Sequence, residues 1–358
     1  MNVTVLATGG TIASTADEGE TGANPTKRGR ELVDAVPPLS GLADLTVEDV
    51  VQVPSYELDA ESLEAIGERV CEMDADPSVD AVVVTHGTDT MAESAYYVDV
   101  TVQPETPVLF TGAQRRPDEV SADGPSNLLT AVQTARAFRE REEYEGADGG
   151  TFVAFDETVH SARAVRKVHT SRLPAFRSPG HGPVAVVDRN GVAIRRQPQR
   201  ETHPISATSL SATVVTVTST SCADDTLLRA AIDRGVDGIV VEGTGLGNVT
   251  APIGNAVATA IEAGIPVVVT SRCLAGRTSP VYGGDGGGQT LRDHGAIFAG
   301  DLSPGKARLR LSLAIAAAAD RGIDEPTATG EWLREAFVGP REEPSPDATS
   351  LSAETGET

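Results

Sequence analysis

Three short segments of this chain place hydroxyl, carboxylate and amine side chains where such groups could do chemistry. The first is TGGT at residues 8–11, which ends the opening apolar run. The second is THGTDT at 85–90, and the third is SARAVRKVHTSR at 161–172, which contains Lys167. Together they supply a hydroxyl nucleophile and a Thr–Lys–Asp relay to activate it, which is the logic of a serine-type triad built from other residues.

The TGGT segment offers Thr11 as the candidate nucleophile. After a strand, paired glycines let the backbone approach a ligand and leave N–H groups free to face it. A plain strand-to-loop turn has the same composition, so the segment alone does not decide between the two. The glycine spacing differs from the GxGxxG turn that opens a helix, which argues against dinucleotide binding.

In the second segment the candidates are Thr88 and Asp89, since an aspartate beside an exposed threonine can hold a cation or order a hydroxyl. His86 has no HxH or HxxE partner, which favours a structural role over metal binding. Only three of the 29 basic residues are lysine. Retention of Lys167 among arginines indicates a task that arginine cannot do, because a desolvated amine can lose its proton and act as a base.

The elements around these segments indicate an α/β fold. Continuous apolar, β-branched runs predict strands at residues 3–8, 80–87, 106–113 and 150–155, and helical patterns occupy 60–73 and 127–140. Strands without polar alternation, separated by helices, predict a parallel sheet that is covered on both faces. Ligands bind at the carboxyl ends of such strands, where the candidate segments lie.

The chain is long enough for two domains, since its 358 residues exceed the size at which one core usually keeps growing. We expect a larger N-terminal parallel-sheet α/β domain over residues 1–188 and a smaller C-terminal α/β domain over 212–338. Residues 189–211, rich in Arg, Pro, Ser and Thr, predict an interdomain linker. The polar, Pro-rich residues 339–358 predict a disordered acidic tail.

The net charge of −23 and the pI near 4.6 argue against nucleic acid or an anionic membrane as a partner. Acids spread along the whole chain, with little lysine, are typical of a protein adapted to high salt. Cys71, Cys222 and Cys273 are widely spaced, which indicates neither a disulfide framework nor structural zinc. Without a signal-peptide pattern or a long apolar run, a cytoplasmic protein is predicted.

In these segments and in several others, the chain resembles the bacterial-type L-asparaginase family. ATGGTIAS, THGTDTMAESA, TGAQRRPDEVSADGPSNL at 111–128 and the Lys167 segment occur in the order and roughly the spacing of that family. DGIVVEGTGLGN at 237–248 and PVVVTSRCLAGRT at 266–278 extend the resemblance to about residue 335. It implies a two-domain amidohydrolase that turns L-asparagine into L-aspartate and ammonia. It also implies no metal or cofactor, and a homodimer or homotetramer.

The resemblance assigns roles residue by residue. Thr11 resembles the nucleophile that attacks the side-chain amide and forms a covalent acyl-threonine intermediate. Thr88, Asp89 and Lys167 match a second triad, in which Lys167 polarises Thr88 and Asp89 holds Lys167.

Substrate contacts are implied in the same way. Asp89 would face the α-ammonium group and Ser55 would bind the α-carboxylate, with Tyr56 and Glu57 completing that wall. Asn248 matches a residue that contacts the pocket, often across a dimer interface.

One departure concerns the loop after the nucleophile, where many family members carry a tyrosine that is hydrogen-bonded to it. No tyrosine occurs between Thr11 and Tyr56, and Ala23, Asn24 or Pro25 stands in the equivalent region. Either another group activates Thr11, or Lys167 acts on both threonines through water.

Three alternatives to an asparaginase stay open. The ammonia-producing subunit of archaeal tRNA-dependent glutamine synthesis shares TGGTIAS, HGTDT and the TGA of residues 21–23, but has an extra N-terminal domain. Here the motif begins at residue 8, which favours a free-standing hydrolase. A glutaminase-asparaginase differs by one substrate methylene, worth only about 1–3 kcal/mol. A non-catalytic amino-acid sensor would lack at least one of the four reactive side chains, and all four are present.

Overall fold

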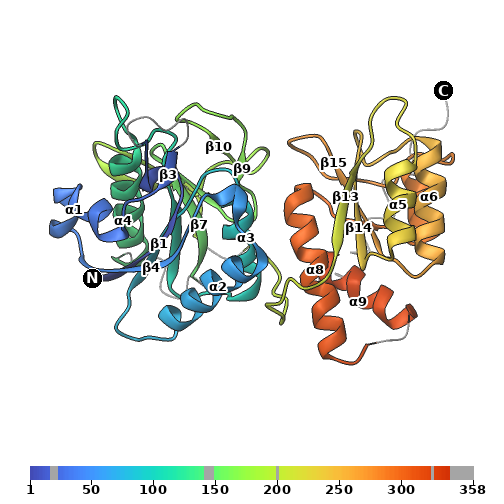
Figure 1. Ribbon diagram of the computed structural model, residues 1–358, viewed down its shortest axis with the longest axis horizontal. Coiled ribbons are helices and arrows are strands. Elements are labelled where there is room, and N and C mark those ends of the chain that lie inside the picture. Colours follow the sequence, from blue (N-terminus) through green and yellow to red (C-terminus); the bar gives the residue numbers. More distant parts are fainter. Residues whose placement is uncertain (17–22, 141–148, 199–200, 324–325, 339–358) are drawn as a thin grey trace, which may run out of the picture.

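The computed structural model describes residues 1–16, 23–140, 149–198, 201–323 and 326–338, and they form two α/β domains (Figure 1). This confirms the predicted fold class, with the larger domain first in the chain. The TGA loop at 21–23 lies mostly outside the described residues, and the predicted tail at 339–358 lies wholly outside them.

Within the described residues, the large sheet has eight strands in the order β12-β11-β8-β7-β6-β5-β1-β4. The five strands from β4 to β7 in that order run parallel, and β8, β11 and β12 extend the sheet antiparallel. The strands are β1 (Asn2–Gly9), β4 (Asp44–Val53), β5 (Ala81–Thr85), β6 (Pro107–Thr111), β7 (Gly150–Phe155), β8 (Thr158–Ser161), β11 (Ala185–Asp188) and β12 (Gly191–Ile194).

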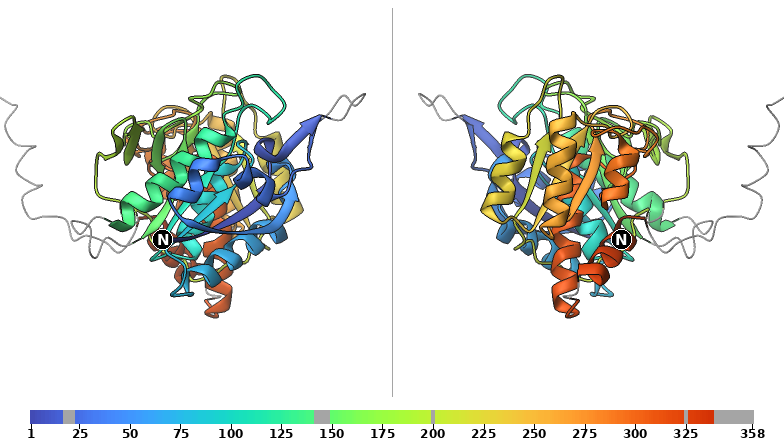
Figure 2. Two further views of the ribbon diagram at one scale, coloured as in Figure 1. Left: turned by 90° about the vertical axis from the view of Figure 1, so that its left-hand side faces the viewer. Right: turned by 90° about the vertical axis from the view of Figure 1, so that its right-hand side faces the viewer.

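Helices cover both faces of this sheet, which explains why its central strands are apolar without alternation. On one face lie α1 (Gly29–Asp34) and α4 (Gly124–Glu140), and on the other lie α2 (Ala60–Asp74) and α3 (Met91–Thr101) (Figures 1 and 2). Along β5, Val82 and Val84 are buried on the α2 and α3 side, while Ala81 and Val83 are buried on the α4 side.

The smaller domain has a parallel sheet in the order β13-β14-β15-β16. Helix α8 covers the face that looks toward the large domain, and α5 and α6 cover the other face (Figure 1). Residues of α3 and α8 belong to one continuous buried cluster, so the two domains share part of their core. The elements are β13 (Val214–Thr218), α5 (Thr226–Arg234), β14 (Gly238–Gly243), α6 (Ala251–Glu262), β15 (Val267–Ser271), α7 (Gly288–His294), β16 (Ile297–Phe298), α8 (Pro304–Asp320) and α9 (Pro326–Val338).

The segment predicted as a linker, residues 189–211, is not linker throughout. Its residues 191–194 form β12, because Val192 and Ile194 pack against the core on the α4 side. Later residues of the segment pack on the large domain: the Tyr97 hydroxyl donates to the Thr208 carbonyl at 2.7 Å.

The remaining elements are short and lie near the carboxyl ends of the strands or in connecting loops. They are η1 (Thr11–Ala13), β2 (Ser14–Ala16), β3 (Ala23–Pro25), η2 (Pro37–Gly41), η3 (Ser55–Glu57), β9 (Arg166–Lys167) and β10 (Phe176–Arg177), where η marks a 3₁₀ turn.

Candidate active site

The candidate segments meet because β1 and β5 are parallel neighbours in the large sheet. In their register Ala7 pairs with Thr85, and the Thr8 hydroxyl donates to the Thr85 carbonyl at 2.9 Å. The loops that follow both strands therefore leave the sheet at the same edge, and they bring Thr11 and Thr88 to one site.

Glycines make this approach possible at the level of the backbone. Gly10 has φ 78° and ψ −177°, a conformation that is essentially restricted to glycine. A β-carbon on Gly10 would lie 2.3 Å from the Gly87 nitrogen, and one on Gly87 would lie 2.5 Å from the Ser55 hydroxyl oxygen. The loops after β1, β5 and β4 thus touch where no side chain fits. A β-carbon on Gly9 would likewise lie 2.7 Å from the Val53 carbonyl oxygen, which explains the paired glycines before Thr11.

Lys167 reaches the site from β9, which pairs with β10. Its amine donates to the Thr88 hydroxyl at 2.8 Å and to the Asp89 carboxylate at 2.6 Å. The Lys167 side chain is 15% exposed, whereas that of Asp89 is 57% exposed. The amine is thus largely shielded between a hydroxyl and a carboxylate, while the carboxylate itself faces solvent.

These loops surround a pocket that is open to solvent. Five of the residues singled out in the sequence line it, and Lys167 stands behind Thr88 and Asp89. The described residues that line the pocket are Gly10, Thr11, Ser14, Pro54, Ser55, Tyr56, Gly87, Thr88, Asp89 and Arg116. Glu57 and Asn248 are not among them, and the Asn248 side chain instead accepts from the Gly288 N–H at 3.0 Å in the smaller domain.

Two polar lining residues were missed by the sequence analysis. The Ser14 hydroxyl donates to the Gly10 carbonyl at 2.8 Å, which ties the turn around Thr11 together. Arg116 follows β6 and pairs with Asp118 at 3.0 Å. The sequence carries a signal for it, because Arg115 and Arg116 closely follow the strand predicted at 106–113, where ligand-binding loops gather.

His86 lies under the site and faces the protein interior. Its Nδ1 is 2.7 Å from the Gly87 carbonyl oxygen, and burial lowers the pKa of the imidazole to about 4. In the described part of the chain, no three His, Cys, Asp or Glu side chains gather as metal ligands would. A neutral, backbone-bonded His86 helps to fix the loop that carries Thr88.

Two further features of the described ranges bear on the environment of the protein. No helix there combines the length and apolar character that crossing a bilayer requires. Cys71, Cys222 and Cys273 are exposed free thiols.

The amino-acid sequence matches known families over both domains. Residues 2–200 match the family described as "Asparaginase, N-terminal", and residues 213–322 match the "Glutaminase/Asparaginase C-terminal domain". L-asparaginase 2 of Escherichia coli is 36% identical over 322 residues, which cover 88% of each chain. L-asparaginase of Bacillus licheniformis is 32% identical, over 88% of this chain and 95% of that protein.

Two other matches are relevant to the function. A subunit of the glutamyl-tRNA(Gln) amidotransferase of Methanopyrus kandleri is 37% identical, over 87% of this chain and 69% of that subunit. The crystal structure of a probable cytoplasmic L-asparaginase from Campylobacter jejuni superposes with a TM-score of 0.77 at 29% identity. That match covers 93% of this chain and 98% of the other.

Proposed function

Because the chain belongs to the asparaginase/glutaminase family, we propose that it is an L-asparaginase, which hydrolyses L-asparagine to L-aspartate and ammonia. The observation that carries this proposal is the contact of Lys167 with Thr88 and Asp89 beside a pocket that also holds Thr11. It places a hydroxyl, an amine and a carboxylate in hydrogen-bonded sequence, as activation of a nucleophile or of water requires.

In the proposed reaction, the Thr11 hydroxyl attacks the side-chain amide carbon and its proton passes to a base. Collapse of the tetrahedral intermediate releases ammonia, which takes up that proton, and leaves an acyl-threonine ester. Water, activated by Thr88 and Lys167, then hydrolyses the ester and frees aspartate. Backbone N–H groups near Gly10 and Thr88 are suitable donors for the oxyanion, and loss of one such donor typically costs about 2.7–4 kcal/mol.

The base for Thr11 acts in one of two ways. Either Lys167, which contacts Thr88 directly, reaches Thr11 through water, or another group acts on Thr11. Support for the first is that the Lys167 amine already holds the Thr88 hydroxyl at 2.8 Å.

The polar groups of the pocket suit an amino-acid amide as substrate. The exposed Asp89 carboxylate is available to a substrate α-ammonium group. Ser55, which is 5% exposed, and Tyr56 both line the pocket, and we assign them to the substrate α-carboxylate.

A second candidate is the ammonia-releasing role in a tRNA-dependent amidotransferase. It is favoured by the 37% identity to the Methanopyrus kandleri amidotransferase subunit, although the match spans only 69% of that protein. The two functions differ in what the protein does alone. An asparaginase releases ammonia from free asparagine without a partner protein, whereas an amidotransferase subunit needs its partner and charged tRNA for full activity.

Location, assembly and salt dependence complete the proposal. We place the enzyme in the cytoplasm, which the match to a probable cytoplasmic L-asparaginase of Campylobacter jejuni supports. We also expect a homodimer or homotetramer, as the family resemblance implies. The charge of −23 supports a protein that works in concentrated salt, where repulsion between its acidic groups is screened.

The test is ammonia release from the purified protein, with asparagine and glutamine compared in molar salt. Thr11→Ala should abolish turnover of either amide, and Lys167→Met should reduce it strongly, while both variants keep the wild-type melting temperature. Full activity in Thr11→Ala would refute Thr11 as the nucleophile. Absence of turnover by the wild type without added partner would favour the amidotransferase role or a non-catalytic sensor.

A further inference from the structure

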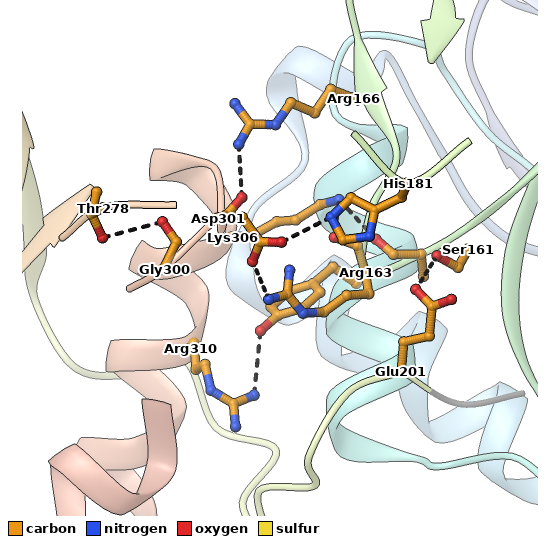
Figure 3. A network of polar contacts seen from close by, with 12 residues as sticks. Ser161, Arg163, Arg166, His181, Glu201, Thr278, Gly300, Asp301, Lys306 and Arg310 are labelled. Carbon is orange, nitrogen blue, oxygen red and sulfur yellow. Dashed lines mark hydrogen bonds and ion pairs between the residues drawn. The ribbon is translucent and has the colours of Figure 1, made fainter. Parts of the chain in front are cut away.

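A second lysine, Lys306, is buried at the domain interface and binds main-chain oxygens of the large domain. It lies in the first turn of α8 and is 1% exposed. Its amine donates to the carbonyls of Ala162 at 2.7 Å and Arg163 at 3.2 Å, and also to that of Val165. All three N–H donors of the ammonium group are therefore used. Figure 3 shows Lys306 beside Arg163.

The carbonyls bound by Lys306 belong to the segment 161–172 and lie just before Lys167 in the chain. Asp301, which lies just before α8, holds the same segment from the side. Its main-chain oxygen accepts from Arg166 at 2.8 Å, and its carboxylate pairs with Arg163 and lies 2.8 Å from His181 Nε2 (Figure 3). The smaller domain thus fixes both the backbone and the side chains of the residues that precede Lys167.

The same turn of α8 also contacts α3, which begins directly after Asp89 and Thr90. A β-carbon on Gly305 would lie 2.8 Å from the Glu93 carboxylate oxygen, and the Lys306 amine lies 5.7 Å from the centre of the Tyr96 ring. Helix α8 therefore contacts both the segment that contains Lys167 and helix α3, which closely follows Thr88. These two parts of the chain hold the donor and the acceptor of the Lys167–Thr88 hydrogen bond.

Position 306 favours lysine over arginine, although burying its charged amine costs free energy. Burial lowers the pKa of Lys306, and the negative charge of Glu93 opposes that shift. A buried ammonium is tolerated because its hydrogen bonds are made. A tetrahedral ammonium can point three N–H groups at three convergent carbonyls, whereas the planar fork of arginine cannot. This matches the retention of lysine here in a chain that otherwise uses arginine.

We propose that Lys306 is a positioning residue, which from the smaller domain sets the distance between the Lys167 amine and the Thr88 hydroxyl. This inference rests on the proposed function, in which that contact serves catalysis. The smaller domain then contributes to catalysis, even though the described residues that line the pocket belong to the larger domain.

The decisive variant is Lys306→Met, which removes the three donors and keeps the length of the side chain. Its matched control is Arg310→Met, which removes another buried cation from α8. The Arg310 guanidinium donates to the carbonyls of His203 and Ala336 and to the Tyr96 hydroxyl, none of which belongs to the Lys167 segment. Thermal unfolding of both variants measures the loss of stability that any interface change produces.

Two readouts separate positioning from stability. The first is the kinetics of ammonia release from asparagine, where Lys306→Met should lower kcat by about 10- to 100-fold with little change in KM. The second is NMR of protein labelled with ¹³C at the lysine Cε. Only three lysines are present, so the Lys167 signal is assigned by its absence in Lys167→Met. That signal should shift in Lys306→Met and stay in place in Arg310→Met.

An unchanged Lys167 signal in folded Lys306→Met, or a kcat equal to that of Arg310→Met, would overturn the inference. If the wild type releases no ammonia while the Lys167 signal still shifts, the proposed function fails and the positioning role stands. Should Lys306→Met not fold, Asp301→Asn replaces it. This variant loosens Arg163, which belongs to the same segment, and also His181 outside it, and the same two readouts decide.

Discussion

Replacing Gly10 by alanine tests whether the close approach of two loops positions Thr11, the proposed nucleophile. The added β-carbon would lie 2.3 Å from the Gly87 nitrogen and 2.4 Å from its α-carbon. Ordinary contact begins at 3.4 Å, so the two loops must separate by about 1 Å. The backbone conformation adds about 1–3 kcal/mol of strain, because a non-glycine residue rarely adopts it.

We expect this movement to act on catalysis more than on folding. Thr11 is the next residue, and a misplacement of about 1 Å can cost a factor of about 100 in rate, or about 3 kcal/mol of transition-state stabilisation. The measurement is kcat for ammonia release at saturating asparagine, together with the melting temperature of the same sample.

The matched control is Gly264→Ala in the smaller domain. Gly264 also has a positive φ, of 83°, but nothing lies within 4 Å of its added β-carbon. It should lose stability through backbone strain and keep its activity. If Gly10→Ala kept a kcat within about threefold of the Gly264→Ala value, the loop contact would not position Thr11 and the reasoning would be wrong.

Three further predictions concern the relay, acid stability and salt. Lys167→Arg should lower kcat by at least about 100-fold, since a guanidinium stays protonated and cannot act as a base; ammonia release above a tenth of the wild-type rate would contradict this. Because burial lowers the pKa of His86 to about 4, its contribution to stability is complete above the unfolded pKa of 6.5 and is lost as the pH falls, by about 3 kcal/mol at pH 4. Urea unfolding at pH 7 and pH 4 should show a smaller loss for His86→Asn than for the wild type, and equal losses would exclude this role. Dialysis from molar salt into dilute buffer should lower both the melting temperature and the activity, and an unchanged melting temperature would argue against salt adaptation.

Much of the fold followed from local patterns. The runs that became β1, β5, β6 and β7 are apolar on both faces, because helices cover both sides of the sheet. The helical pattern at 60–73 became α2, which is one residue longer at its end.

Several strands of the large sheet were not expected, and both of its edge strands, β4 and β12, are among them. Strand β4, DLTVEDVVQV, pairs with β1 but carries acidic residues toward solvent, so its apolar pattern is interrupted. Strand β12 lies in the segment predicted as a linker. It was not predicted as a strand because it is defined by its pairing with β11 and by its packing on the core, and both depend on the tertiary fold.

The sequence by itself predicted that three of the pocket side chains would meet at one edge of the sheet. Thr11, Thr88 and Asp89 each follow a buried strand, and parallel strands bring such positions to one edge. Their types and order were sufficient to predict hydroxyl chemistry and to recognise the family.

Only the tertiary structure decided the distances and the support. Gly10 and Gly87 touch because β1 and β5 are neighbours, and Arg116 lines the pocket because the loop after β6 folds over it. Lys306 stands 139 positions beyond Lys167 in the sequence, yet it binds the segment that carries Lys167. Contacts between distant parts of the chain depend on how the two domains pack, and local sequence patterns do not predict that packing.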